Sequence, residues 1–349
     1  MAQHLEAEIF LNNRQTGITI DVRTPAEFAA GHIPEAHNIP LFSNEQHAEV
    51  GTIYKKQGKD AAVVRGLELV APCMVEIVKS AKKLTNGRPV FLYCFRGGMR
   101  SSSVAWLLET AGMEVSLLEG GYKAYRNSFD KLLEQHAWKF IMLAGATGCG
   151  KTELLHLIAK KGLQILDLEA LAHHKGSAFG GIEQKEQPTT EQFINLLHET
   201  FRNFDPKQPV CCECESLQIG HVYIPQLLFS MIGKNTIINI EMERSQRLDR
   251  IMHEYGNLPK EALIDAFRRI EKRMGSQQAN EAIAAINSGD IRKAADLGLA
   301  YYDKTYSHRH ADNNNHVISF VADNNDMEGS AEKLMQMVRH CGLDPQSPK

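Results

Sequence analysis

The chain lacks long apolar runs, and its first residues lack the basic-then-apolar pattern that is typical of a secretory signal peptide. No hydrophobic stretch approaches the roughly 20 residues that a membrane-spanning helix needs. The seven cysteines are odd in number and scattered, which does not resemble a disulfide framework. These absences predict a reduced, cytoplasmic protein that does not associate with membranes.

Charge and composition set further limits. The 349 residues carry a formal net charge of −3, which excludes a protein coated in basic residues but permits RNA binding through a local basic face. Hydrophobic residues make up 43% of the chain, enough for two separate cores. The chain has no internal repeat. We expect two globular domains and a monomer.

The first part of the chain alternates short apolar runs with helical periodicity. This pattern predicts a parallel-sheet α/β domain over residues 1–130. In helix 101–111, Val104, Trp106, Leu107 and Leu108 are expected on or near the core face. The predicted strands are 18–22, 89–94 and 115–118, and the predicted helices are 25–30, 67–84 and 101–111.

A second alternation follows the end of a linking helix at 131–138. It predicts a second α/β domain over residues 139–340, with a helical C-terminal region. The loop at 145–152 gives this domain its likeness to P-loop NTPases. The polar, proline-containing segment 341–349 predicts a disordered tail. The predicted strands are 140–144, 163–167, 209–213 and 236–241, and the predicted helices are 152–161, 244–255, 260–274, 278–288 and 291–304.

A cysteine loop follows the predicted strand 89–94. Cys94 stands at the carboxyl end of this strand, two glycines follow it, and a helix begins near Ser101. Parallel sheets form their sites at this edge, and glycine-rich turns aim backbone N–H groups at anions. The positive end of the helix dipole favours a thiolate. We therefore predict that Cys94 is a nucleophile toward a chalcogen or phosphorus centre, with Arg100 facing the same cradle.

Two further segments accompany this loop, the strand-end pattern Asp21-x-Arg23 and the turn 31–34, which reads Gly-His-Ile-Pro. Over about residues 10–130 the chain resembles the rhodanese family. The resemblance implies that Asp21 and Arg23 support the fold and that His32 is a hydrogen-bonded turn residue. A Cys-x5-Arg loop also occurs in cysteine-dependent phosphatases, so a phosphatase and a chalcogen transferase both stay open. No residue identifies itself as the general acid that such a phosphatase needs.

A lysine loop stands between a predicted strand and a predicted helix. Residues 145–152 fit the phosphate-loop pattern G-x4-G-K-[ST], whose backbone amides wrap phosphates. Lys151 is expected to neutralise the phosphates and Thr152 to reach Mg²⁺. Cys149 is interpreted as a small tolerated residue rather than a nucleophile. The predicted phosphate- or diphosphate-binding residues are Gly145, Gly148, Cys149, Gly150, Lys151 and Thr152.

An acidic strand end completes this predicted site. Segment 210–216 is an apolar strand that ends in acids, with Glu215 as the Mg²⁺-associated residue and Glu213 as the alternative. Cys211, Cys212 and Cys214 alternate between the faces of the strand, which favours buried strand residues over a thiolate metal cluster. We expect no resident metal and no tightly bound cofactor.

A rhodanese-like module joined to a phosphate-loop module is a rare pairing, and it resembles the tRNA 2-selenouridine synthase family. Matching stretches are 118–126, 171–180 and 213–225, and the resemblance ends before the tail. Two positions depart from the family pattern. Lys175 stands where the family usually has Arg, and Cys214 replaces an acidic residue, which weakens any metal role at that position.

The resemblance implies two steps on the wobble 2-thiouridine of tRNAs for Lys, Glu and Gln. Geranyl diphosphate first S-geranylates the base, and selenium from selenophosphate then replaces the geranylthio group. In this scheme Lys151 stabilises the departing diphosphate, and Cys94 carries selenium as a perselenide. A selenophosphate-supplying enzyme is an expected partner. The apolar pocket for the geranyl group has no signature in the sequence.

A tRNA partner also requires positive charge. Acidic residues interleave with the basic ones, so a solvated, salt-bridged face is the alternative interpretation. The predicted tRNA contacts are Lys175, in a glycine-flanked loop, and Arg244, Arg247, Arg268, Arg269 and Arg273, on predicted helices.

Two other functions stay open on the sequence alone. One is a P-loop kinase or NTPase with a rhodanese-like regulatory or phosphatase domain, which predicts fast ATP or GTP turnover without RNA. The other is a non-catalytic module that senses anions through two inactive loops, which predicts an unreactive Cys94. Co-purification of tRNA would separate the tRNA-modifying function from both.

Overall fold

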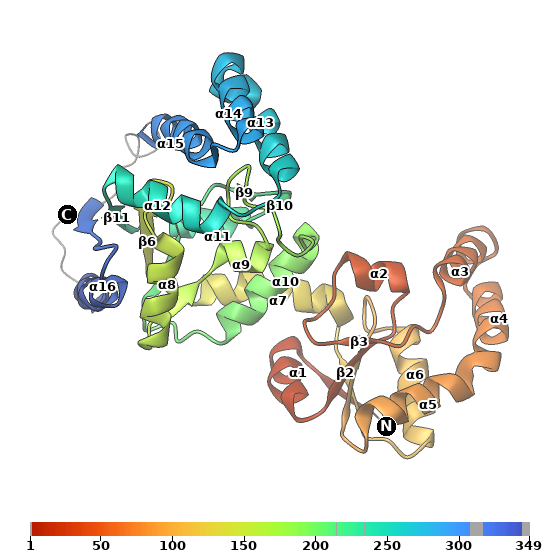
Figure 1. Cartoon of the computed structure of the whole chain (residues 1–349). Helices are drawn as coiled ribbons and strands as arrows, with labels where there is room; N and C mark the ends of the chain where they lie inside the picture. Colours follow the sequence, from red (N-terminus) through yellow and green to blue (C-terminus); the bar gives the residue numbers. More distant parts are fainter. Residues whose placement is uncertain (1, 214, 234, 308–316, 344–349) are drawn as a thin grey trace. The chain divides into compact units, whose positions relative to one another are not determined.

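Two units, each built on a five-stranded parallel sheet, make up the computed structural model (Figure 1). The structure describes residues 2–213, 215–233, 235–307 and 317–343. The first unit is Met1–Gln135 with Ile194–Glu199, and the second is His136–Phe193 with Thr200–Lys349. Two parallel sheets covered by helices confirm the predicted α/β class.

The first unit has the strand order β1-β5-β4-β2-β3, with every neighbouring pair parallel. Its strands are β1 (Gln3–Leu5), β2 (Ile18–Asp21), β3 (His37–Asn38), β4 (Val90–Tyr93) and β5 (Val115–Leu118). Its helices are α1 (Ala7–Asn13), α2 (Pro25–Ala30), α3 (Asn44–Gln57), α4 (Lys59–Val70), α5 (Met74–Thr85), α6 (Met99–Thr110) and α7 (Gly121–Gln135).

The central strand β4 explains why this sheet is covered on both faces. Val90 and Leu92 join one apolar cluster, whereas Phe91 and Tyr93 join another. Successive side chains of a strand point to opposite faces, so an uninterrupted apolar run buries both sides of the strand. Cys94 follows directly and therefore leaves the sheet at its carboxyl edge.

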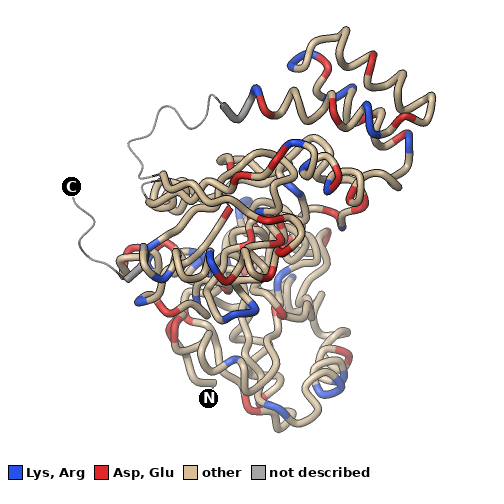
Figure 2. Tube along the Cα trace, turned by 60° about the vertical axis from the view of Figure 1, so that its left-hand side comes forward, with Lys and Arg blue, Asp and Glu red and all other residues tan. Residues whose placement is uncertain are grey.

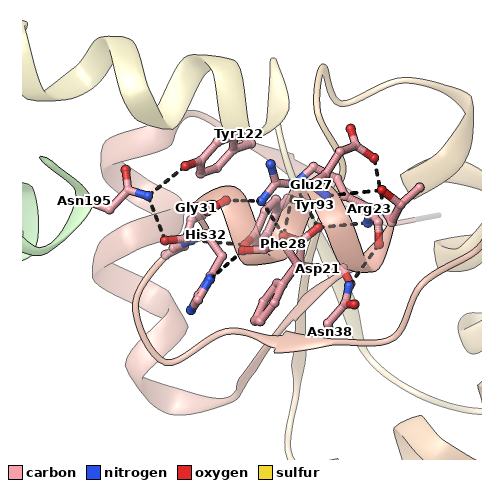
Figure 3. Close-up of polar contacts among 12 residues, drawn as sticks. Asp21, Arg23, Glu27, Phe28, Gly31, His32, Asn38, Tyr93, Tyr122 and Asn195 are labelled. Carbon is pink, nitrogen blue, oxygen red and sulfur yellow. Dashed lines mark hydrogen bonds and ion pairs between the residues drawn. The ribbon is translucent and has the colours of Figure 1, made fainter. Parts of the chain in front are cut away.

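A buried ion pair braces the turn beside this edge (Figure 3). The Arg23 guanidinium donates to both Asp21 carboxylate oxygens at 2.7–3.1 Å and to the Gly31 carbonyl at 2.6 Å. It also stands 3.8 Å from the centre of the Tyr122 ring. Asp21 and Arg23 are both at most 1% exposed, so the pair is part of the core. This placement agrees with a supporting role for both residues.

His32 lies in the same turn, as a hydrogen-bonded residue. Its Nδ1 is 2.9 Å from the Phe28 carbonyl oxygen, and its ring stacks on that of Phe28. Asn195 Nδ2, also in the first unit, donates to the His32 carbonyl at 2.9 Å (Figure 3). Burial lowers the pKa of His32, and the charge of Arg23 lowers it further. The hydrogen bond with the Phe28 carbonyl and the charge of Asp21 oppose this shift without reversing it.

The second unit has the strand order β12-β11-β6-β8-β7, again parallel throughout. Its strands are β6 (Phe140–Gly145), β7 (Gln164–Leu166), β8 (Val210–Glu213), β11 (Thr236–Glu241) and β12 (Val317–Val321), with a small hairpin of β9 (Gln218–Ile219) and β10 (Val222–Tyr223). Its helices are α8 (Lys151–Lys160), α9 (Leu168–Ala172), α11 (Gln226–Ile232), α12 (Arg244–Tyr255), α13 (Lys260–Met274), α14 (Ser276–Ser288), α15 (Ile291–Ser307) and α16 (Met327–Leu343). Helix α10 (Thr190–Arg202) is divided, because its residues Ile194–Glu199 belong to the first unit and its two ends to the second.

Two apolar clusters lie among the described residues of the second unit. One packs α8 and α16 against strands β6, β8 and β11, and it includes Leu154, Ile238 and Leu334. The other joins α13, α14 and α15 through small and aromatic side chains such as Ala282 and Phe267. The predicted helical C-terminal part is therefore confirmed, and it has a core of its own.

Two predictions about the first unit are wrong. The predicted helix 67–84 is broken by a 3₁₀ turn at Ala71–Cys73, because Pro72 donates no backbone hydrogen bond and its ring disfavours an unbroken helix. Trp106 is 61% exposed rather than in the core. It follows Val104 by two residues, which places it on the opposite side of α6 from the buried Val104 and Leu108.

Several elements have no counterpart among the predictions, including α3, α10, α16 and β12. Helix α16 reaches Leu343, so the predicted tail at 341–349 begins inside a helix, and residues 344–349 lie outside the described residues. Cys214 also lies outside them. Cys73, Cys94, Cys149 and Cys211 are free thiols. Within the described ranges, no helix combines the length and the apolar character that crossing a membrane requires.

Candidate functional site

The Cys94 thiol lies beneath its loop, at the start of a helix. Its Sγ is 3.1 Å from the hydroxyl of Ser101, in the first turns of α6. Cys94 is only 3% exposed, whereas Phe95 and Arg96 of the same loop are exposed. A thiolate here would accept the Ser101 hydroxyl hydrogen bond and meet the positive end of the α6 dipole. The site is thus suited to a nucleophile that reacts with a small ligand.

A glycine turn holds this loop in place. A Cβ atom on Gly121 would lie 2.3 Å from the Cys94 carbonyl oxygen and 2.4 Å from the Gly97 nitrogen. Tyr122 N–H donates to the Cys94 carbonyl at 2.9 Å, and Lys123 N–H donates to the Phe95 carbonyl at 3.0 Å. Only glycine permits such a close approach of two backbones. The turn at 120–121 therefore fixes the conformation of the loop.

Arg100 has a carboxylate partner that sequence reasoning missed. Its guanidinium donates to the two Glu27 oxygens at 2.7 and 3.2 Å. Burial acts to raise the pKa of Glu27, but hydrogen bonds from Arg100 and from Thr24 N–H lower it to about 2. The expectation that Arg100 simply faces Cys94 is therefore incomplete, because an arriving anion must compete with Glu27. The capping pattern Thr24-x-x-Glu27 was a local signal for Glu27, but it predicts only a helix start.

The phosphate loop has the backbone of an anion cradle. Gly148 and Gly150 each have a φ of +81°, in the left-handed region that favours glycine. Lys151 Nζ donates to the Gly145 carbonyl at 3.0 Å and so folds back along the loop. Cys149 is fully buried beside Gly145, where a Cβ atom would lie 2.7 Å from its sulfur. Cys149 therefore supports the loop from below.

A polar cavity of about 1050 Å³ lies beside this loop. Lys151 and Thr152 line it, together with Lys175 and Arg250. Arg250 Nη1 donates to Asn324 Oδ1 at 2.9 Å, and its Nη2 would be 3.1 Å from a Cβ atom on Gly150. This arginine is a candidate phosphate contact that sequence reasoning left out of the site. In the sequence, its spacing of three residues from Arg247 was the pattern that could have pointed to this arginine.

Three carboxylates meet on the wall of the polar cavity. Glu169 of α9, Glu213 of β8 and Glu215 offer oxygen atoms that lie within 4.8 Å of one another. Glu213 is 2% exposed, and its Oε1 is buried with no hydrogen-bond partner among the described residues. A Cβ atom on Gly176 would lie 2.8 Å from Glu215 Oε2, so the loop backbone closes the cluster.

Burial and mutual repulsion change the protonation of this cluster. Burial, followed by the charges of Glu213 and Glu215, raises the pKa of Glu169 to about 9. Burial also raises the pKa of Glu213, although Lys151 and a hydrogen bond from Thr152 oppose the shift. Oxygen ligands with a spare buried lone pair fit a hard divalent cation such as Mg²⁺. The two strand-end candidates, Glu213 and Glu215, thus lie together, and Glu169 joins them from outside the motif.

Known sequences match both halves of the chain. Residues 3–128 match the rhodanese-like domain, and residues 138–338 match the tRNA 2-selenouridine synthase AAA domain, which is more than half of the chain. A tRNA 2-selenouridine synthase of Shewanella denitrificans is 32% identical over 364 residues, covering 94% of this chain and 96% of that protein. The chain belongs to the tRNA 2-selenouridine synthase family.

Other similarities are more limited in extent. The tRNA 2-selenouridine synthase of Nitrosomonas eutropha is 38% identical over 245 residues, which are 68% of this chain and 62% of that protein. The chain thus spans less than two thirds of the length of that relative. A rhodanese-related protein from Thermoplasma volcanium of known structure is 18% identical, covers 36% of this chain and 92% of its own, and has a TM-score of 0.24.

In this family member, Arg247 supports the phosphate loop from inside. Its guanidinium donates to the Thr147 carbonyl at 3.1 Å and to both Asp303 oxygens at 2.8 and 2.9 Å. Arg247 is only 7% exposed. A buried guanidinium that bonds both a loop carbonyl and a carboxylate is not available to RNA. The structure therefore gives Arg247 a supporting role in the phosphate loop in place of the predicted tRNA contact.

The other predicted tRNA contacts lie on the surface of this family member. Arg244 pairs with Asp296 at 2.9 Å, and Arg268 pairs with Asp265 at 3.1 Å. Lys175 pairs with Glu254 beside the polar cavity. Arg269 and Arg273 are exposed on α13. Figure 2 shows that acidic and basic residues are interspersed along the chain, so charge alone does not separate an RNA face from a solvated one.

Replacing Arg247 with alanine should destabilise the second unit by about 1–3 kcal/mol, because Asp303 and the Thr147 carbonyl both lose their partner. The matched change Arg244→Ala breaks an exposed pair and should cost about 0–1 kcal/mol. Urea denaturation of the full chain, followed by tryptophan fluorescence and circular dichroism, measures both. Equal losses for the two variants would contradict the supporting role of Arg247.

Proposed function

We propose that this chain is a transferase that converts the wobble 2-thiouridine of tRNA into 2-selenouridine. The observation that carries this proposal is that one member of the tRNA 2-selenouridine synthase family holds both a strand-end cysteine loop and a phosphate loop that opens on a polar cavity. The reaction needs two separate anionic co-substrates, geranyl diphosphate and selenophosphate. The two loops offer one binding site for each of them.

The phosphate loop is suited to the first step. The thiocarbonyl sulfur attacks C1 of geranyl diphosphate, the C–O bond breaks with departure of diphosphate, and N3 of the base loses its proton. The loop amides, Lys151 and Arg250 would stabilise the charge that develops on the diphosphate. The product carries sulfur as a thioether, which leaves more readily than a thiocarbonyl sulfur.

The Cys94 loop is suited to the second step. Attack of the Cys94 thiolate on phosphorus of selenophosphate would form an S-phosphorylated cysteine and release hydrogen selenide, without any change in oxidation state. Selenide then attacks C2 of the base and expels geranylthiolate. Water would hydrolyse the S–P bond on Cys94, which releases phosphate and returns the thiol. A perselenide on Cys94 would require either attack at selenium with phosphorus leaving at the phosphite level, or an added oxidant. Attack at phosphorus is the route that balances with release of phosphate. Mass spectrometry of the protein after incubation with selenophosphate distinguishes the two adducts.

The remaining participants follow from this assignment. The exposed arginines Arg268, Arg269 and Arg273 on α13 are candidates for phosphate contacts with tRNAs for Lys, Glu and Gln. An enzyme that makes selenophosphate would supply the second step. The acid cluster of Glu169, Glu213 and Glu215 would hold Mg²⁺, which would neutralise part of the diphosphate charge.

The direct test combines purified protein, tRNA that contains 2-thiouridine, geranyl diphosphate and selenophosphate. Nucleoside mass spectrometry should detect S-geranyl-2-thiouridine with the first donor alone and 2-selenouridine with both. The alternative function, a P-loop kinase or NTPase with a rhodanese-like regulatory domain, predicts ATP or GTP hydrolysis without RNA. Such hydrolysis with no modified nucleoside would overturn the proposal.

Replacing Cys94 with serine should abolish 2-selenouridine formation and leave S-geranylation intact, because the prenyl step uses the other loop. Serine preserves the size of the side chain but is a far weaker nucleophile at neutral pH. The control Cys73→Ser changes an exposed thiol in the same unit and should retain both products. Wild-type yields of 2-selenouridine from the Cys94 variant would contradict the assignment of Cys94 to the selenium step.

Replacing Lys151 with alanine should lower S-geranylation by about 100-fold or more, the usual effect of losing one group that stabilises the transition-state charge. The control Lys139→Ala removes an exposed lysine at the opposite end of β6. Supplied with tRNA that is already geranylated, the Lys151 variant should still insert selenium, because that step releases no diphosphate. Normal geranylation by this variant would falsify the assignment of the phosphate loop.

The acid cluster should bind Mn²⁺, used as a calorimetric probe for Mg²⁺, and Glu213→Gln should weaken this binding by about 10- to 100-fold. The control Glu281→Gln removes an exposed carboxylate on α14 that pairs with Lys293. EDTA should slow S-geranylation by the wild type and leave that of the Glu213 variant unchanged. Equal Mn²⁺ affinity in the wild type and both variants would exclude a cation from this cluster.

A further inference from the structure

A second cavity lies in the helical part of the second unit. It is about 70 Å³ in volume and is lined almost entirely by apolar atoms of α12, α13, α14 and α15. Figure 1 shows α13, α14 and α15 packed together in this region. An apolar cavity with a route to solvent favours a hydrocarbon ligand, because transfer of apolar surface out of water is favourable.

This apolar cavity adjoins the phosphate site and shares part of its wall. Thr147, Ser177, Ile251 and Tyr255 line both the apolar cavity and the polar cavity of about 1050 Å³. Thr147 is itself a residue of the phosphate loop, and its carbonyl accepts the hydrogen bond from Arg247. One ligand with an anionic head and an apolar tail would therefore fill both spaces at once.

The polar groups of the apolar cavity exclude a nucleobase as its occupant. The hydroxyls of Thr147, Ser177 and Tyr255 stand on the wall shared with the polar cavity. The Tyr302 hydroxyl already accepts a hydrogen bond from Ala178 N–H at 3.1 Å. A purine inside the cavity would leave several ring nitrogens without partners, which is unfavourable in an apolar surrounding. A hydrocarbon chain has no such groups.

The apolar cavity exists because α15 carries small residues where it faces the cavity. Ala295 and Gly298 line the cavity, and a Cβ atom on Gly298 would already lie 3.4 Å from the Phe267 ring. At about 70 Å³ the cavity is smaller than the ~150 Å³ that admits benzene. It therefore takes only the terminal methyl groups of the last isoprene unit, while the rest of the chain lies along the shared wall.

We propose that this cavity binds the distal end of the prenyl chain of the allylic diphosphate donor and limits the length of that chain. The proposal rests on the proposed function for the choice of donor, and it adds the location of the chain and the residues that select its length. The diphosphate occupies the phosphate loop, the first isoprene unit passes Thr147 and Tyr255, and the last unit enters between α13 and α15.

Calorimetry with geranyl diphosphate and with inorganic diphosphate tests the cavity without relying on catalysis. Wild-type protein should bind geranyl diphosphate more tightly than diphosphate. Ala295→Leu fills the cavity, so it should weaken geranyl diphosphate binding by about tenfold or more and leave diphosphate binding unchanged. The matched control Ala300→Leu adds the same atoms to α15 at a position that does not line the cavity, and it should behave as the wild type.

Chain length gives the second readout. Met252 lines the cavity and is only partly buried, so Met252→Ala should enlarge the space at little cost to folding. We expect this variant to gain transfer from farnesyl diphosphate relative to geranyl diphosphate by about tenfold. Wild-type behaviour of both Ala295→Leu and Met252→Ala, in binding and in chain length, would overturn the cavity assignment while leaving the proposed function in place. If wild-type protein neither binds geranyl diphosphate nor transfers the prenyl group, the proposed function itself fails, and the cavity assignment fails with it.

Discussion

The loop of Cys94 rests on the turn at Gly120 and Gly121 with no space for a Cβ atom between the two backbones. The same constraint recurs in the second unit, where Gly145 closes over the Cys149 sulfur and Gly148 meets the Arg247 carbonyl. Both loops must turn their amides toward a ligand, so those amides cannot be used to hold the loop. Backbone contact at glycine supplies the rigidity instead, and the chemistry of each site depends on it.

Arg247 extends this rigidity into the helical part of the second unit. It bonds the Thr147 carbonyl of the phosphate loop and the Asp303 carboxylate of α15. The helix that provides Asp303 also provides Ala295 and Gly298 to the apolar cavity. One buried guanidinium therefore ties the loop that would hold a diphosphate to the helix that would accept its hydrocarbon chain. Arg247 would thus fix the distance between the site for the diphosphate and the site for the hydrocarbon chain of one ligand.

Local patterns predicted much of the fold. Strands 115–118 and 236–241 and helices 25–30, 244–255 and 260–274 coincide with β5, β11, α2, α12 and α13. A capping box at Thr24 and Glu27 marks the start of α2, and glycines follow the ends of α12 and α13. The errors arise where tertiary packing decides. Trp106 is apolar but lies on the solvent side of α6, and Pro72 breaks a helix whose periodicity continues across it. Helix α3 has no buried residue, so it gave no apolar pattern to detect.

The sequence by itself determined where the two loops stand, because a strand, a glycine turn and a helix start are local features that read in order along the chain. It therefore also placed the two groups proposed for the chemistry, the Cys94 sulfur and the Lys151 ammonium, in those loops. Only the tertiary structure decided what surrounds them. Glu27 meets Arg100 across 73 residues, Glu169 joins Glu213 and Glu215 from a different helix, and Arg247 turns inward to Asp303. Sheet order and helix packing bring such partners together. Neither their charge nor their spacing in the chain predicts that they will be in contact.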